Sequence, residues 1–434
     1  MRITGGYRRG IGTEVIAILL VLIIVVGIAG YFLFLSQPGG EKAKLQGYIK
    51  VGFTVPLAGN YSEIGSEFLE GVKLWGEWTN QTGIKVNGQT YGVKLVYYDD
   101  KGDPEQVTKL YEKLITSDKV DFLITPPVDP LARAAIQVAE QYGKIIIVTT
   151  PEESLFRHAL KYSYQIVTPG SKFFTQVLDI SKSLDPNSTK IAIIFLDTPA
   201  TRIMASGVKL WATQNGYQIV FEYYYKPGQT KFDSIAIAVA QKSPDIIVGG
   251  GGIQETMALV KALYDKGVRP KVLALLDAPL RDQFTELGNI AIGVMGVSEW
   301  EVYATYSPFG AQQLNLTWYG PSLTEFVVMY NNKYKEAPTS ITAIGFASGL
   351  VIQYGVENAS STNTEKVMQA LDNANLLTLF GVIKFDSTPE LHGLQIGHQP
   401  LVIQWVERGG QPVKVVIAPQ EFATAQPLYP LPWG

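Results

Sequence analysis

Residues 48–75, YIKVGFTVPLAGNYSEIGSEFLEGVKLW, decide the class of fold that this sequence adopts. The run 48–55 is rich in β-branched and aromatic residues and predicts a strand. The residues that follow, from Ile64 to Trp75, place apolar side chains at spacings of four, four and three, which forms one apolar stripe on a helix. A strand followed directly by an amphipathic helix is the repeating unit of parallel α/β sheets.

The same alternation continues in a first series of elements that ends at residue 150. Strands are predicted at 92–100, 120–125 and 144–150, and helices at 103–115 and 131–143. The first of these helices starts with Asp103 as a cap and Pro104 in its first turn, and the second ends at Gly143. The strand at 144–150 has an apolar run, IIIV, between Lys144 and two threonines, which is typical of a strand buried on both faces of a parallel sheet.

A second series of strands and helices follows the first. Its strands are predicted at 190–197, 217–225, 244–250 and 271–277, and its helices at 171–184, 202–216, 232–243 and 254–267. Two consecutive series of this kind predict two doubly wound lobes rather than one sheet. Residues 298–335 are less regular, and helical patterns return at 343–359 and 363–374.

The composition excludes several classes of function. The net charge is −3 at pH 7, so the chain has no electrostatic preference for nucleic acid. The absence of cysteine excludes disulfides, thiolate metal sites and a cysteine nucleophile. His392 and His398 lack the spacing and partner ligands of a metal site, which favours a surface or hinge role. The sequence contains no nucleophile elbow and no convincing catalytic dyad, so we expect no enzyme, no metal and no cofactor.

The N-terminal segment predicts a membrane anchor. Residues 15–35 are apolar and carry no charge, and a helix of this length spans about 30 Å, the thickness of one hydrocarbon core. Three arginines in the first nine residues precede this run, which places the N-terminus in the cytoplasm and the rest of the chain outside. We therefore predict a cytoplasmic or signal segment at 1–14, a transmembrane helix at 15–35 and a linker at 36–47.

The same segment also resembles a processed signal. Arg9 and Gly10, then Glu14, precede the apolar run, as in the class III signals of prepilins and of archaeal surface binding proteins. In those proteins a peptidase cuts beside the glycine and leaves the apolar segment on the mature protein. Both interpretations export the domain and keep it tethered, so the expected location is the outer face of the cell membrane.

Several stretches together resemble a known family. IKVGFTVPLAGNYSEIGSEFLEGVKL (49–74) followed by VKLVYYDDKGDPEQVTKLYEKLI (93–115) is similar to the opening of the periplasmic branched-chain amino acid- and amide-binding proteins. These proteins are the solute receptors of ABC importers. The likeness extends through KIAIIF, DIIVGGGGIQETMALVKALYDKGV, GFASGLVIQYGVENA and FGVIKFD, and covers nearly all of residues 48–418.

The resemblance implies the type I periplasmic-binding-protein fold, in which two Rossmann-like lobes are joined by three hinge crossings. The crossings are expected near 165–169, 294–299 and 384–390. The expected first lobe comprises 48–166 and 298–384, the second comprises 167–297 and 385–418, and a tail occupies 419–434. The solute is expected between the lobes, where the carboxyl ends of the parallel strands face one crevice.

The resemblance also implies positions for ligand-binding residues. In amino acid-binding members, hydroxyl groups of the first lobe hold the carboxylate of the ligand, and an acidic residue of the second lobe holds its ammonium group. The second-lobe acid corresponds to Asp277, and the alternative for this residue is the start of a turn. The first-lobe positions after the two apolar strands are Thr125, Val128 and Asp129, then Thr149, Thr150, Glu152 and Glu153. The alternative for Asp129 is a cap on the following helix.

The aromatic positions of the family are not kept in this sequence. Ile64, Ala200 and Gly252 stand where the family has tyrosines, which widens the expected pocket. Trp300 is expected either to refill it or to pack at the hinge. Carboxylates at carboxylate-binding positions repel the acid group of an amino acid when they are desolvated. These residues therefore leave four possibilities for the identity of the solute: an amino acid, an amide, a cationic compound or a short peptide.

The sequence thus predicts a surface-tethered solute receptor that closes about a hinge and delivers its ligand to an ABC permease. Two alternatives remain at this stage. A sensory ectodomain uses the same fold, and a pilin-like surface subunit uses the same kind of N-terminal helix. A two-lobe domain of this size is poorly explained by scaffolding alone.

Overall fold

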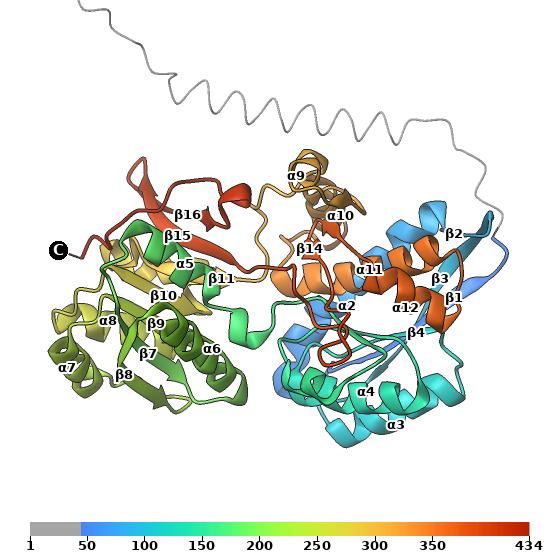
Figure 1. The fold of residues 1–434 in the computed structure, drawn as a ribbon, viewed down its shortest axis with the longest axis horizontal. Coiled ribbons are helices and arrows are strands. Elements are labelled where there is room, and N and C mark those ends of the chain that lie inside the picture. Colours follow the sequence, from blue (N-terminus) through green and yellow to red (C-terminus); the bar gives the residue numbers. More distant parts are fainter. Residues whose placement is uncertain (1–44, 434) are drawn as a thin grey trace, which may run out of the picture. The chain divides into compact units, whose positions relative to one another are not determined.

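The computed structural model describes residues 45–433, and Figure 1 shows two β-sheets, each with helices on both faces. The predicted membrane helix at 15–35 and the signal residues Arg9, Gly10 and Glu14 lie outside the described residues. Within residues 45–433, none of the helices combines the length and the apolar character needed to cross a bilayer.

The sheet of the first lobe has the strand order β2-β3-β1-β4-β5-β6. Its strands are β1 (Tyr48–Val55), β2 (Ile84–Val86), β3 (Gln89–Asp99), β4 (Phe122–Ile124), β5 (Ile146–Val148) and β6 (Ser163–Gln165). All neighbours are parallel except β2, which forms an antiparallel pair with β3. The four strands that the sequence predicts are confirmed, whereas β2 and β6 are short and were not predicted.

Helices cover both faces of this sheet. The helices of the first lobe are α2 (Ser62–Thr82), α3 (Pro104–Thr116), α4 (Asp129–Tyr142), α11 (Ser340–Ala359) and α12 (Thr364–Asp372). The helices α2 and α11 supply one core, and α3 and α4 supply the core on the opposite face. The predicted helix ends are confirmed, because the Asp103 side chain accepts a 2.9 Å hydrogen bond from the N–H of Glu105 and Gly143 ends α4 with a φ of 63°.

The sheet of the second lobe has the order β16-β15-β11-β10-β9-β7-β8. Its strands are β7 (Lys190–Leu196), β8 (Gln218–Tyr225), β9 (Ile246–Gly250), β10 (Val272–Leu276), β11 (Met295–Ser298), β15 (Leu401–Arg408) and β16 (Gln411–Ala418). Its helices are α5 (Thr175–Leu184), α6 (Pro199–Asn215), α7 (Asp233–Lys242) and α8 (Ile253–Asp265). Because this sheet is buried on both faces, Ile247 packs in one core and its neighbours Ile246 and Val248 pack in the other.

The remaining elements are two helices, a small sheet and several short 3₁₀ helices. They are α9 (Pro308–Gln313), α10 (Leu323–Tyr334) and a small sheet of β12 (Thr317–Trp318), β13 (Leu376–Thr378) and β14 (Gly381–Ile383). Short 3₁₀ helices are η1 (Gly59–Tyr61), η2 (Ser154–His158), η3 (Gly170–Lys172), η4 (Ala278–Leu280), η5 (Asp282–Ala291) and η6 (Gln420–Phe422).

The chain passes between the two large sheets three times, after β6, after β11 and between β14 and β15. Residues 385–395 stay beside the first lobe, since the N–H of Gln165 donates to the carbonyl of Gly393 at 2.9 Å. The type I fold expected from the resemblance is therefore present, with a second sheet that is mixed because β15 and β16 are antiparallel.

Candidate functional site

The polar residues predicted for binding lie at the carboxyl ends of parallel strands in both lobes. Thr125 follows β4 and Thr149 follows β5, while Gly252 and Asp277 follow β9 and β10. The strands within each pair are hydrogen-bonded neighbours, so their carboxyl ends meet at one edge of each sheet. This edge is where open α/β sheets bind ligands.

The hydroxyl groups of Thr125 and Thr149 are used to tie the two strand ends together. Their Oγ1 atoms are 2.9 Å apart, and Thr125 Oγ1 also accepts a 3.0 Å hydrogen bond from the Thr149 N–H. Both side chains are buried. This pairing leaves these two hydroxyls little capacity to hold a ligand carboxylate, which is the role that the family resemblance implies for them.

Asp129 and Thr150 lie beside each other at the same end of the sheet. Asp129 is the first residue of α4, but the cap position is Val128, and no side chain caps the helix. Asp129 Oδ1 and Thr150 Oγ1 are both shielded from water, and the Thr150 hydroxyl is the polar group nearest in effect to the Asp129 carboxyl. Burial raises the pKa of Asp129, and the nearby Thr150 hydroxyl opposes part of that rise.

Glu152 and Glu153 are buried, and neighbouring groups balance the negative charge of each carboxylate. Glu152 forms an ion pair with Arg133 and accepts a 2.8 Å hydrogen bond from the N–H of Ser154. Glu153 accepts a 2.9 Å hydrogen bond from the N–H of Ser171, which belongs to the second lobe, and its other oxygen lies 3.6 Å from Arg157. These two carboxylates therefore serve internal contacts.

Asp277 is the acid of the second lobe. Its Oδ2 accepts a 2.8 Å hydrogen bond from the N–H of Gly252, and its φ of 58° is unusual for a residue other than glycine. The side chain is exposed, yet desolvation by the surrounding protein raises its pKa, opposed by the Gly252 N–H and by Arg281. Asp277 is therefore an accessible carboxylate at a strand end of the second lobe.

The backbone conformation at Gly252 favours glycine. Its φ is 76°, a region that residues with a Cβ atom rarely adopt. The glycine therefore allows its N–H to approach Asp277 closely. The run of glycines at 249–252 thus brings bare backbone beside the acid.

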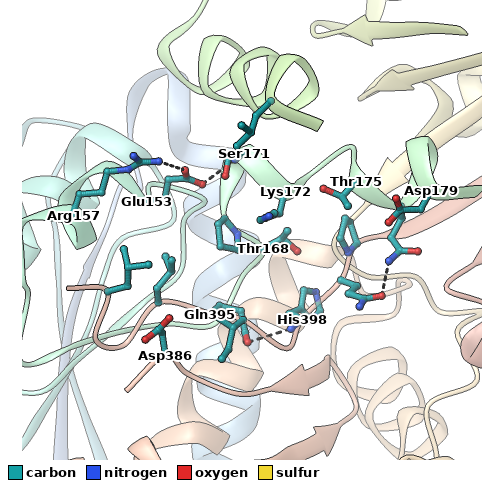
Figure 2. Close-up of a pocket in the computed structure, with 18 residues that line it drawn as sticks. Glu153, Arg157, Thr168, Ser171, Lys172, Thr175, Asp179, Asp386, Gln395 and His398 are labelled. Atoms are coloured by element: carbon teal, nitrogen blue, oxygen red, sulfur yellow. Dashed lines mark hydrogen bonds and ion pairs between the residues drawn. The ribbon is translucent and has the colours of Figure 1, made fainter. Parts of the chain in front are cut away.

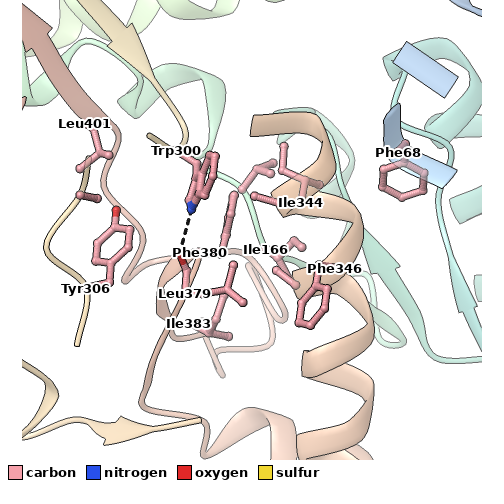
Figure 3. Close-up of a cluster of buried hydrophobic side chains, with 14 of the residues drawn as sticks. Phe68, Ile166, Trp300, Tyr306, Ile344, Phe346, Leu379, Phe380, Ile383 and Leu401 are labelled. Carbon is pink, nitrogen blue, oxygen red and sulfur yellow. Dashed lines mark hydrogen bonds between the residues drawn. The ribbon is translucent and has the colours of Figure 1, made fainter. Parts of the chain in front are cut away.

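The other predicted positions differ in their surroundings. Ile64 on α2 and Ala200 on α6 are half-buried. Trp300 is buried in the apolar cluster of Figure 3, where its indole N–H donates to the Leu379 carbonyl at 2.8 Å. Its ring meets Phe326 edge to face at 5.7 Å. These contacts correspond to the hinge-packing alternative for Trp300.

One carboxylate joins all three hinge crossings. Glu299 Oε2, on the second crossing, accepts hydrogen bonds from the Thr168 N–H at 3.3 Å and the Thr168 hydroxyl at 3.1 Å. Thr168 lies on the first crossing. The same oxygen is 3.0 Å from Nε2 of His398, which lies on the third crossing and stacks on Phe380 with a ring separation of 4.6 Å. One carboxylate therefore links the three crossings, and sequence reasoning missed Glu299.

A cavity of about 530 Å³ lies beside the hinge, with walls from both lobes (Figure 2). The first lobe contributes Glu153 and Arg157, the second contributes Ser171 and Lys172, and the third crossing contributes His398. Figure 2 shows Glu153 between Arg157 and Ser171 at the rim. Glu153 is the one predicted site residue in this wall, so the cavity is separate from the edge that carries Asp129 and Asp277.

Comparisons with known proteins agree with this architecture. The model of a family described as "Periplasmic binding protein" matches residues 48–411. A "Leu/Ile/Val-binding protein homolog 7" of Brucella abortus (strain 2308) is 21% identical over 339 residues, which is 76% of this chain and 82% of that protein.

Two solved structures show the same fold with different ligands. A branched-chain amino acid transporter substrate binding protein from Streptococcus pneumoniae, in complex with isoleucine, is 17% identical with a TM-score of 0.62, and the match covers 85% of this chain and 99% of that one. A solute binding protein of an ABC transporter from R. palustris, in complex with benzoate, is 18% identical with a TM-score of 0.61, covering 87% and 98%.

Proposed function

The chain belongs to the periplasmic binding protein family, the solute-binding proteins of ABC transporters, and from this premise we propose that it traps one small solute between its lobes for delivery to a permease. The observation that carries this proposal is the gathering of polar groups at the strand ends of both lobes. In the first lobe these groups come from Asp129 and Thr150, and in the second lobe they come from Gly252 and Asp277. The proposal includes no catalytic step.

Closure about the hinge is the proposed means of capture. The three crossings are tied to one another through Glu299, which supports a single hinge region for this movement. Binding a solute between two lobes replaces water at both faces and stabilises the closed arrangement, as in other hinged binding proteins. The affinity then comes from burial and hydrogen bonds.

The proposed location is the outer face of the cell membrane. The apolar run at 15–35 supports a single N-terminal tether, and Arg9, Gly10 and Glu14 support processing by a class III peptidase that leaves this run in place. A tethered receptor stays close to its permease, which raises its effective concentration there.

The proposed solute is a small nitrogen-containing compound of the amino acid and amide class. The two structural neighbours bind isoleucine and benzoate on one fold, so the fold does not select the solute and the side chains of this chain must. Asp277 supports a solute with an N–H donor, because it offers an exposed carboxylate at a strand end of the second lobe.

A thermal-shift screen of the full-length protein tests the proposed function. The compounds are leucine, valine and isoleucine, the corresponding amides, polyamines, short peptides and benzoate. At 100 times its dissociation constant, a ligand adds about 2.7 kcal/mol to the free energy of unfolding, which raises the melting temperature measurably. We expect at least one nitrogen-containing compound to do this. A flat response to every compound, confirmed by calorimetric titration, contradicts the proposal.

A further inference from the structure

The cavity beside the hinge is large enough to hold a small molecule. Its volume of about 530 Å³ falls within the range of about 300–1,000 Å³ that is usual for ligand sites. Its walls include parts of 168–179, at the start of the second lobe, and of 386–400, on the third crossing (Figure 2). Asp129, Gly252 and Asp277 lie outside its lining, so the cavity is separate from the strand ends proposed to hold the solute.

Three polar side chains on one wall of the cavity have no partner among the residues that the structure describes. They are the ammonium group of Lys172 and the hydroxyl groups of Ser171 and Thr175, and Figure 2 shows Lys172 between the other two. Lys172 ends η3 and Thr175 begins α5, so the three groups lie within five residues. Ammonium and hydroxyl groups all donate hydrogen bonds. This wall therefore presents three donors to whatever fills the cavity.

Three acids also line the cavity, and each already receives a hydrogen bond from the protein. Glu153 accepts a 2.9 Å hydrogen bond from a backbone N–H. Asp179 accepts one of 2.8 Å from the indole N–H of Trp211. Asp386 accepts one of 2.8 Å from the N–H of Thr388. The acids thus have donors within the protein, whereas the ammonium group on the facing wall lacks an acceptor.

The third crossing gives the cavity an apolar surface. Leu391, Leu394 and Ile396 all belong to its lining. The Ile396 side chain is 52% exposed, so a ligand in the cavity can cover it. Removing apolar surface from water favours binding in proportion to the area covered. A ligand with an apolar body therefore fits this part of the wall.

We propose that this cavity is a second ligand site, for a monocarboxylate with an apolar body. The carboxylate accepts hydrogen bonds from Lys172, Ser171 and Thr175, and the body packs on Leu394 and Ile396. A hydrogen bond between an ammonium and a carboxylate is about twice as strong as one between neutral groups. A second negative charge on the ligand is disfavoured, because two cations and three acids line the cavity and their formal charges sum to −1 with histidine neutral.

A ligand in this cavity touches both lobes, so its affinity depends on how the lobes are turned. The 2.9 Å hydrogen bond from the Ser171 N–H to Glu153 joins the lobes at one side of the cavity. The 2.6 Å hydrogen bond from Gln176 to Gln399 joins α5 to the third crossing at another side. On the premise of the proposed receptor function, occupancy of the cavity therefore changes the affinity for the solute, and the solute changes the affinity for the cavity ligand by the same factor.

Calorimetric titration of the full-length protein at pH 7.5 with hexanoate, hexylamine and suberate tests the site. These probes carry one negative charge, one positive charge and two negative charges on similar apolar chains. We expect hexanoate to bind at least tenfold more tightly than either of the others. Binding of hexylamine or suberate more tightly than hexanoate would overturn the proposal.

Substitutions in the two walls locate the bound hexanoate. Lys172→Gln removes the charge and should weaken hexanoate at least tenfold, whereas Lys172→Arg should restore most of the affinity. Ile396→Ser removes the apolar contact and should weaken hexanoate about fivefold. Lys242→Gln is the matched control, because it changes an exposed lysine at the end of α7, and its affinity for hexanoate should equal that of the wild type.

The melting temperatures of these variants separate a ligand contact from a structural role. Lys172 and Ile396 are both exposed, so each ligand-free variant should melt at the temperature of the wild-type protein. A variant that melts lower is replaced by Thr175→Val, which removes one of the three donors and should weaken hexanoate several-fold. Equal hexanoate affinity in the wild type, Lys172→Gln and Thr175→Val would overturn the site.

The coupling to the solute is measured with the compound that the thermal-shift screen identifies. Saturating hexanoate should change its affinity at least threefold in the wild-type protein, and this effect should be lost in Lys172→Gln. The same affinity with and without hexanoate would overturn the coupling. If hexanoate binds through Lys172 but no compound of the screen stabilises the Lys172→Gln protein, the receptor function fails and the cavity site stands.

Discussion

Asp277→Asn is expected to lower the affinity for an amine-bearing solute about a hundredfold. Truncating one partner of a desolvated charge pair typically costs about 2–5 kcal/mol, and each 1.4 kcal/mol is a factor of ten. Asparagine keeps a carbonyl oxygen that can accept the hydrogen bond from the Gly252 N–H, so the loop is expected to stay in place. Calorimetric titration at pH 7.5 measures the loss.

The melting temperature of the Asp277→Asn variant shows whether the substitution affects the fold as well as the binding. The pKa of Asp277 is raised in the folded protein, so the fold disfavours the ionised form at neutral pH. Removing the charge should leave the melting temperature of the ligand-free protein equal or higher. Asp282→Asn is the control, because it changes a nearby acid whose side chain is 91% exposed. The affinity of this variant for the solute should equal that of the wild-type protein. Unchanged binding in Asp277→Asn would remove this residue from the site.

Gly349→Ala is expected to destabilise the protein by about 3 kcal/mol. A Cβ atom at this position would lie 1.9 Å from Cδ2 of Trp75, whose side chain is fully buried where α2 packs on α11. Trp75 is also held by a 3.2 Å hydrogen bond from its indole N–H to Gln353 Oε1. Overpacking of a rigid core costs about 1–3 kcal/mol, occasionally more, and neither helix can move without losing other contacts.

Urea unfolding followed by circular dichroism measures this loss. The matched control is Gly76→Ala on α2, where the nearest atom to a new Cβ is Cδ1 of Leu95 at 3.2 Å, the end of a flexible side chain. We expect the control to change the free energy of unfolding by less than about 1 kcal/mol, because that side chain can shift. Equal losses in the two variants would show that the close contact with Trp75 is not the cause.

The elements that could be predicted from the sequence are those with strong local signals. The strand 48–55 and the helix after Asp103 have a clear period or a cap, and the structure confirms them as β1 and α3. β6 was missed because its three residues, Ser163–Gln165, are polar and carry no pattern. β15 and β16 had a usable signal, two apolar runs around Gly409 and Gly410, which is typical of a hairpin.

The sequence alone predicted only some residues of the candidate site, and the reason is physical. The strand ends locate Thr149 and Asp277 from the sequence, since parallel strands bring their carboxyl ends to one edge. Partners that come from distant parts of the chain leave no local pattern. Glu152 was expected to repel an acid group, but Arg133 compensates its charge. The contact of Glu299 with His398 joins residues 99 positions apart, and only the folded chain shows it.

The measurement that tests the central claim most directly is the distance between the lobes with and without solute. The chain has no cysteine, so spin labels at Lys101→Cys, beyond β3, and Lys226→Cys, beyond β8, report one distance between two exposed sites. Pulsed electron paramagnetic resonance should give a shorter distance when the ligand found by titration saturates the protein. The same distance with and without saturating ligand would contradict capture by closure of the two lobes.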